Sequence, residues 1–233
     1  MRKTTKSLLL ICVFIISMSL NAMAAADTKT DDKVGVEVSD KLIEICENFF
    51  ETSTGEYRAI DKTGNDVTNE FYNQYKAAYD NREYEVLSDA IADELMCIKW
   101  RDVQQVGMAR SSLIPVTVRD EFYALGQTKK LLNGKKTFEM VYSIKGTFQF
   151  VSNTGEIRSY SNPTFNMEWF SAGAAFDYQL HNLSTNAVKR DSNRVDFSAK
   201  FYINLSGNYE GVSIGYEIVG PFSGIVSGYG EVI

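Results

Sequence analysis

The chain has 233 residues and a formal net charge of −6 at pH 7, with 44% hydrophobic and 23% charged residues. This length suits one large domain or two small ones. The acidic balance argues against nucleic acid as a partner, because binding to phosphates needs a surface rich in Lys and Arg. It also argues against adsorption to anionic lipid.

The N-terminus has the layout of a secretory signal peptide. Three basic residues precede an apolar run from Leu8 to Leu20, and the small-residue stretch "NAMAAA" follows. Ala22 and Ala24 fit the A-x-A rule, so cleavage is expected after Ala24, with Ala26 as the alternative. The apolar run is about 13 residues long, short of the roughly 20 that a membrane-spanning helix needs. The sequence therefore predicts secretion by way of a cleaved signal peptide, and no transmembrane segment in the mature chain.

Removal of residues 1–24 takes away three basic and no acidic residues, which lowers the net charge from −6 to −9. Residues 25–37 carry charge and little apolar bulk, so we expect them to form a disordered tether. Residues 38–110 are expected to be mainly helical, and residues 111–233 to form an antiparallel β region that belongs to one domain with the helices.

The helical region is predicted from apolar spacing near 3.6 residues. Helices are expected over residues 39–54 and 67–80, with a short strand between them. A third helix is expected from Tyr84, because its apolar stripe continues with regular spacing through Leu87, Ile91, Leu95 and Ile98.

The β region is predicted from strict alternation of apolar and polar residues. The apolar positions are even in residues 138–150, odd in 195–205 and even again in 212–218. A two-residue hairpin turn must switch the parity of a shared apolar face in this way. The turns that satisfy this rule are Asn153-Thr154, Ser171-Ala172, Asp191-Ser192 and Gly207-Asn208, and Asn133-Gly134 is a further hairpin signal.

These turns predict specific cross-strand pairs. Phe150 should face Ile157, Trp169 should face Ala174, and Ile203 should lie between Leu180 and Val212. A glycine-rich last strand is expected after Gly220-Pro221. The predicted fold class is α+β, with N-terminal amphipathic helices packed on a six- to seven-stranded antiparallel meander, either a curved sheet or a partly closed barrel.

Candidate catalytic residues lie on the polar face of the predicted sheet. His181 is the single histidine. Gln179 and Asp177 share its face of the strand, two and four positions earlier in the sequence. A general base oriented by a carboxylate is one interpretation, and a pair of acids among Asp177, Asp196, Glu168 and Glu217 is another. A solvated polar face accounts for the same residues, so a non-catalytic role is favoured over an enzyme.

Two glycines on the polar side of the last hairpin suggest a contact surface. Tyr209, Gly211, Ser213 and Gly215 share that side. Glycine weakens a strand unless something approaches closely, so a helix, a turn or a partner is expected to pack on this patch.

Cys46 and Cys97 remain after removal of the signal peptide, and two interpretations stand side by side. An oxidising compartment permits a disulfide, whereas the apolar neighbours of each residue suit two buried thiols. One histidine and two cysteines do not fill a tetrahedral zinc shell, so neither a metal nor another cofactor is expected.

These observations predict an exported, non-catalytic protein of bacterial type that binds a partner or ligand at the cell envelope or outside the cell. A cell-envelope protein and a glycan are both compatible partners. The alternative is a secreted hydrolase that uses polar-face carboxylates with His181. The sequence leaves the oligomeric state open.

Overall fold

The computed structural model describes residues 38–52, 56–107, 112–128, 136–172, 176–209 and 212–232. The chain divides into two compact units, Met1–Glu37 and Val38–Ile233, and all described residues belong to the second. The predicted signal peptide, the predicted tether and the Asn133-Gly134 turn lie outside the described residues.

Among the described residues, three helices precede most of the strands: α2 (Asp40–Glu51), α3 (Thr68–Asp80) and α4 (Tyr84–Glu94). Ser39 caps α2, because its Oγ accepts a hydrogen bond from the backbone N of Leu42 at 2.9 Å. The same Oγ donates to Glu139 Oε2 at 2.6 Å, which fixes the start of the helix to the sheet. None of the three helices has the length and apolarity needed to cross a lipid bilayer.

The third helix ends earlier than its apolar stripe predicts. Leu95–Val106 forms strand β2 instead, and Leu95 and Ile98 are both buried against the helices. A register shift explains why these two residues, three positions apart, lie on one face. Asp61 pairs with Leu95 and Ile60 pairs with Cys97, so Met96 is skipped and the alternation changes phase. A bulged strand therefore imitates helical spacing.

Six strands form the larger antiparallel sheet, in the order β1-β2-β3-β4-β5 with β6 also paired to β4. Besides β2, its members are β1 (Tyr57–Asp61), β3 (Leu113–Thr128), β4 (Lys136–Val151), β5 (Ile157–Tyr160) and β6 (Thr164–Ser171). Three strands form a second antiparallel sheet in the order β7-β8-β9: β7 (Phe176–Lys189), β8 (Arg194–Tyr209) and β9 (Val212–Tyr229). Neither sheet closes on itself among the described strands.

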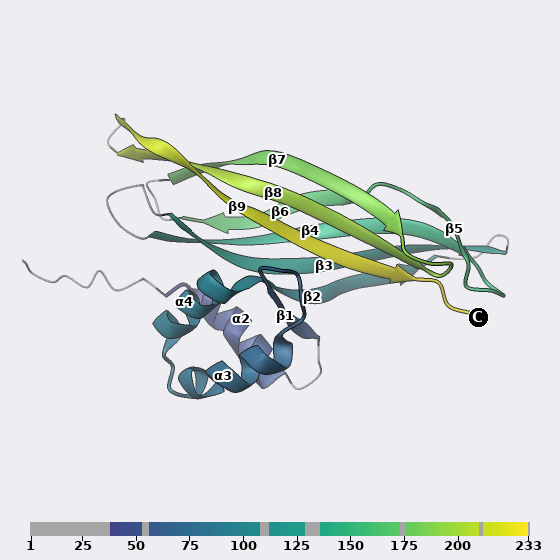
Figure 1. The fold of residues 1–233 in the computed structure, drawn as a ribbon, viewed down its shortest axis with the longest axis horizontal. Coiled ribbons are helices and arrows are strands. Elements are labelled where there is room, and N and C mark those ends of the chain that lie inside the picture. Colours follow the sequence, from purple (N-terminus) through teal and green to yellow (C-terminus); the bar gives the residue numbers. More distant parts are fainter. Residues whose placement is uncertain are drawn as a thin grey trace, which may run out of the picture. The chain divides into compact units, whose positions relative to one another are not determined.

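The predicted sheet-rich character with a few helices is present, but the single meander is wrong. The chain passes from one sheet to the other between β6 and β7, so the hairpin predicted at Ser171-Ala172 does not form. Ala174, the predicted partner of Trp169, lies outside the described residues. The aromatic face of β3 and β4 is covered by the second sheet, and Figure 1 shows β7, β8 and β9 lying across these strands. The buried cluster between the sheets includes Phe122, Tyr142, Phe148, Phe197, Phe201 and Val226.

The helices cover part of the opposite face of the larger sheet. Their apolar side chains form a second cluster with residues of β2, β3 and β4, among them Ile98, Tyr123 and Val141. Figure 1 shows the three helices gathered beside β1 and β2. The parity of the sequence therefore identified a buried face, while the element that buries it is a sheet and not the helices.

Two of the predicted pairs are confirmed: Phe150 pairs with Ile157, and Leu180 pairs with Ile203. The Gly207-Asn208 turn is wrong, because β8 and β9 remain paired as far as Tyr209 and Val212. Ile203 therefore pairs with Val219 and not with Val212.

The displaced register changes which residues of β9 are buried. The predicted apolar face of 212–218 included Tyr216 and Ile218, yet these are 73% and 46% exposed. Phe222 and Val226, beyond Gly220-Pro221, are the residues of β9 that enter the core. The expected last strand is thus the second half of β9 and not a separate strand.

Cys46 and Cys97 are free and buried, so the disulfide alternative is not formed. Cys46 belongs to the cluster beneath the helices, whereas Cys97 belongs to the cluster between the sheets. The larger sheet separates the two thiols. Burial and the charges of Glu139 and Glu47 raise the pKa of Cys46 to about 12, and burial raises that of Cys97 to about 12.

Side chains of β2 tie the two sheets together along one seam. Lys99 Nζ donates to the backbone carbonyl of Ile225 at 3.2 Å, and Arg101 Nη2 donates to that of Ser227 at 3.4 Å. Buried Asp120 lies 2.7 Å from Arg101 Nε and 3.8 Å from Lys99 Nζ. The carboxylate holds both cations where they reach β9.

Candidate ligand-binding pocket

A kink in β9 is the local feature that creates a pocket. Phe201 pairs with Phe222 and Ile203 pairs with Val219, so Gly220 and Pro221 are skipped by the ladder. Proline has no backbone N–H to donate and is tolerated in strands at edges and bulges. Gly220 has a φ of 134°, which an L side chain rarely adopts.

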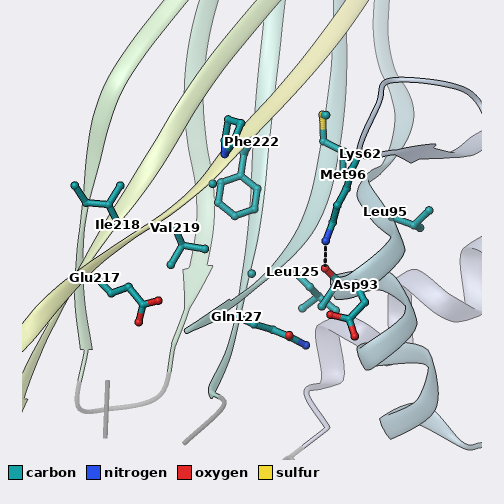
Figure 2. Close-up of a pocket in the computed structure, with 14 residues that line it drawn as sticks. Lys62, Asp93, Leu95, Met96, Leu125, Gln127, Glu217, Ile218, Val219 and Phe222 are labelled. Atoms are coloured by element: carbon teal, nitrogen blue, oxygen red, sulfur yellow. Dashed lines mark hydrogen bonds between the residues drawn. The ribbon is translucent and has the colours of Figure 1, made fainter. Parts of the chain in front are cut away.

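We call the hollow beside this bend the kink pocket. Its volume is about 400 Å³, and its walls come from β9, from the end of β3 and from the junction of α4 with β2. Figure 2 shows the lining side chains gathered between these elements. The larger apolar side chains of the lining are Leu95, Met96, Leu125, Ile218, Val219 and Phe222.

Four polar or charged side chains also line the pocket: Lys62, Asp93, Gln127 and Glu217. Lys62 Nζ donates to the carbonyl of Ala92 at 2.9 Å, an interaction drawn in Figure 2. Asp93 and Glu217 lie on opposite sides of the space, Asp93 on α4 and Glu217 on β9. The lining therefore carries two carboxylates and one ammonium group.

The walls are held by contacts that lead into the core. Leu95, Leu125 and Phe222 are almost wholly buried. Ser223, next to Phe222, donates through Oγ to Met96 Sδ at 2.7 Å, and its carbonyl accepts from Tyr142 Oη at 2.8 Å. These contacts fix β9 to β2 and β4 directly after the kink.

The chemistry of the lining suits binding. A volume of this size lies in the range of small-ligand sites, which are about 300–1,000 Å³ and mostly apolar with a few polar groups. The described lining residues include no serine, cysteine or histidine, so they offer no hydroxyl, thiol or imidazole for covalent or base catalysis. Among the described residues, no group of three or more His, Cys, Asp or Glu side chains is placed to hold a metal ion.

The predicted catalytic residues are not brought together. His181 and Asp177 lie on β7, opposite Tyr202 and Ser206 of β8, and their separation of four positions corresponds to ~13 Å along a strand. Asp196 lies on β8 opposite Val188, six positions along β8 from Tyr202, the partner of His181, and hence ~20 Å from it along the strand direction.

The third predicted acid, Glu168, lies in the other sheet on β6, where it forms an ion pair with Arg119. Its Oε1 accepts from Ser143 Oγ at 2.5 Å and lies 2.7 Å from Arg119 Nη2. The hydrogen bond from Ser143 has the largest effect on the pKa of Glu168. Together with the contact with Arg119 it outweighs burial, so this pKa lies below its ordinary value.

Asp196 is 5% exposed and belongs to a structural cluster. Its carboxylate accepts from Arg190 Nε at 2.8 Å, Arg194 Nε at 2.9 Å and Ser227 Oγ at 2.8 Å. Burial opposes ionisation, but hydrogen bonds from Arg190, Ser227 and Arg194 outweigh it, so the pKa of Asp196 is lowered. The contacts connect β8, β9 and the turn before β8.

The predicted contact surface of Tyr209, Gly211, Ser213 and Gly215 lies where β8 ends and β9 begins. Gly211 and the side chains of Tyr209 and Ser213 lie outside the described residues. Gly215 has a φ of 109°, so the backbone conformation by itself requires glycine there. A partner on this patch stays a prediction.

The kink pocket was missed by the sequence analysis. The signal is Gly220-Pro221, which by the sequence pattern alone marks a boundary between strands. A proline inside an alternating apolar pattern also marks a bulge, and a bulge bends the strand and disrupts its ladder.

Comparison of the chain with models of protein families, with curated proteins and with solved structures finds no match.

Proposed function

We propose that this chain is an exported, non-catalytic protein that acts by binding, at the cell envelope or outside the cell, and that the kink pocket receives an apolar group of its ligand. Export rests on the basic, apolar and small-residue order of residues 1–26. Binding rests on one observation: a preformed pocket of about 400 Å³ with an apolar floor and a charged rim.

The alternative, a hydrolase built on polar-face carboxylates with His181, lacks support from the geometry. Hydrolysis of glycosides needs two carboxyl groups about 5–9.5 Å apart around one cleft. Asp196 and Glu168 are each engaged by arginine, in different sheets. No observation favours this second function.

A fluorescence titration tests the proposal. The neutral, polarity-sensitive dye Nile red is titrated into the chain comprising residues 25–233. We expect a saturable rise in emission, because the dye leaves water for the apolar floor of the pocket.

Two matched variants locate the binding. Ile218 lines the pocket and is 46% exposed, while Ile225 lies on the same strand, is 45% exposed and is not among the pocket's lining residues. Ile218→Asn should weaken the dye about five- to tenfold, since a partly buried apolar contact contributes ~1 kcal/mol. Ile225→Asn should leave it unchanged. Equal affinity of both variants and the native chain would place the dye elsewhere and remove the basis of the proposal.

A further inference from the structure

Met96 is the oxidisable side chain of the kink pocket. It is half-buried and lines the pocket together with Phe222, and Figure 2 draws it with its sulfur in yellow. A thioether carries no acidic proton, so it reacts with an oxidant without first having to ionise, and the product is methionine sulfoxide. Because Met96 borders an open hollow, a small oxidant that enters the pocket meets this side chain.

The other described sulfur atoms have different surroundings. Met140 is 0% exposed in the core between the sheets, and Met167 packs partly buried against the same core. Cys46 and Cys97 are buried, and burial raises the pKa of each to about 12, which keeps them as unreactive thiols. None of these four residues is among the described residues that line the pocket. Met96 is therefore the described residue whose oxidation would alter the pocket directly.

The sulfur of Met96 also holds one wall of the pocket in place. Ser223 Oγ donates a hydrogen bond to Met96 Sδ at 2.7 Å, so the thioether joins β2 to β9 directly after the kink. Phe222, the residue before Ser223, belongs to the apolar floor. The state of this sulfur therefore affects both the polarity of the lining and the position of β9.

An oxygen atom on Met96 Sδ weakens an apolar site in either of two positions. On the line to Ser223 Oγ it has no room, because the two atoms are only 2.7 Å apart, so Ser223 and the adjoining part of β9 have to move away. In the space from which the oxidant arrives, it places a polar atom among the apolar side chains of the lining. A polar atom without a hydrogen-bond partner lowers the affinity for an apolar group.

We propose that Met96 is an oxidation site that switches off the kink pocket. A lone pair of Met96 Sδ attacks one oxygen of hydrogen peroxide, the O–O bond breaks, and the other oxygen leaves as water with both hydrogens. The thioether loses two electrons and the peroxide gains them, so no further reactant is needed. Reduction of the sulfoxide reverses the change. The inference rests on the proposed function, because it concerns the regulation of the same pocket.

Peptide mapping by mass spectrometry identifies the oxidised residue. The folded chain comprising residues 25–233 is treated with hydrogen peroxide for increasing times, and each methionine-containing peptide is followed for the gain of one oxygen atom. Met96 should react at least about tenfold faster than Met140, since susceptibility follows exposure. In a denaturing concentration of guanidinium chloride the two residues should react at equal rates, which is the control for intrinsic reactivity.

A titration with Nile red measures the effect on the pocket. Each chain is compared with itself before and after peroxide treatment, once the oxidant has been removed. The native chain and the matched control Met167→Leu should lose about fivefold or more in affinity, because the lining becomes polar or β9 is displaced. Met96→Leu should keep the affinity that it has before treatment, since leucine has no sulfur. Methionine sulfoxide reductase with a thiol reductant should restore the affinity of the native chain.

Each outcome bears on the inference. Oxidation of Met96 that leaves the affinity for Nile red unchanged overturns the switch and leaves the proposed function standing. An equal loss in Met96→Leu assigns the effect to another residue and overturns the switch as well. The same holds if Met96 reacts no faster than Met140 in the folded chain, because the pocket then does not admit the oxidant. If Nile red does not bind the untreated native chain, the proposed function fails and the inference fails with it.

Discussion

Gly224 of β9 faces the ring of Phe122 so closely that a methyl group has no room between them. A Cβ built on Gly224 would lie 2.7 Å from Phe122 Cε1 and 2.9 Å from Ile144 Cδ1. Gly228 meets Phe148 in the same way at 2.4 Å. The glycines of β9 therefore allow the two sheets to pack closely, and the glycine-rich end of the sequence serves the interior.

Gly224→Ala should lower the free energy of unfolding by about 1–3 kcal/mol, as expected for overpacking of a dense core. Alanine gains roughly 0.5–1 kcal/mol over glycine in strand propensity, so a net loss shows that the steric clash dominates. Urea unfolding measures the change. The double variant Phe122→Leu/Gly224→Ala provides the control, because a smaller side chain at 122 should recover about 1 kcal/mol of the sum of the single losses. Strict additivity would contradict the contact.

Cys46 and Cys97 should remain thiols in the secreted chain. Their mass measured under denaturing conditions should be the same with and without reductant, whereas a disulfide lowers it by two hydrogens. Iodoacetamide at pH 8 should label neither residue in the folded protein, because burial raises the pKa of each to about 12 and excludes the reagent. Both should label in 6 M guanidinium chloride, which serves as the control for reactivity.

Asp196→Asn should destabilise the protein by about 1–3 kcal/mol at pH 7, because Arg190 and Arg194 lose a charged acceptor. The pKa of Asp196 is lowered in the folded state, so its contribution is present above the unfolded value of about 3.9 and is lost as the pH falls through the folded value. Urea unfolding at pH 7 and pH 3 should show a gap between native chain and variant that narrows in acid. Asp177→Asn, at an exposed position, should leave the free energy of unfolding unchanged at both pH values. A gap between native chain and Asp196→Asn that stays constant across the pH range would contradict the role of Asp196.

Export should depend on the apolar run. Expressed in a bacterial secretion host, the full chain should appear outside the cytoplasm with an N-terminus at Ala25 or Asp27, as N-terminal sequencing would show. Leu10→Arg should retain the chain in the cytoplasm, because a charge interrupts the apolar segment. Secretion of that variant at the native level would contradict the signal peptide.

Much of the strand content could be predicted because burial on one face imposes a period of two. The even positions of β4, such as Phe138, Tyr142 and Phe148, are buried as the parity requires. Parity also gave Leu180 opposite Ile203. Leu180 reaches this partner because the bulge between His181 and Ser184 shifts the register by one residue between the turn and this pair.

The failures come from places where the register shifts or the chain changes sheet. Asn182 has a φ of 52° within a bulge of β7. From Ser184 to Lys189, each residue of β7 therefore pairs with β8 one position away from the register that holds up to His181. The passage from β6 to β7 keeps the parity expected of a hairpin, so the pattern does not reveal that the strands part. Parity identifies the side on which a residue lies, but not the element that covers it.

Gly220-Pro221 signals the bulge in β9, but the pocket beside it could not be predicted, because its walls are far apart in the sequence. Leu95 follows a helix, Leu125 lies near the end of β3 and Phe222 follows a proline. Each residue by itself looks like an ordinary member of a core. Only the tertiary arrangement leaves a space between them.

Lys99 and Arg101 of β2 also affect the tendency of the protein to aggregate through its strand edges. Carbonyl groups along an open strand edge can template pairing between molecules and so lead to aggregation. Lys99 and Arg101 occupy the carbonyls of Ile225 and Ser227, with Asp120 balancing their charge. Side chains of the same chain therefore shield this half of β9 from pairing with a second copy.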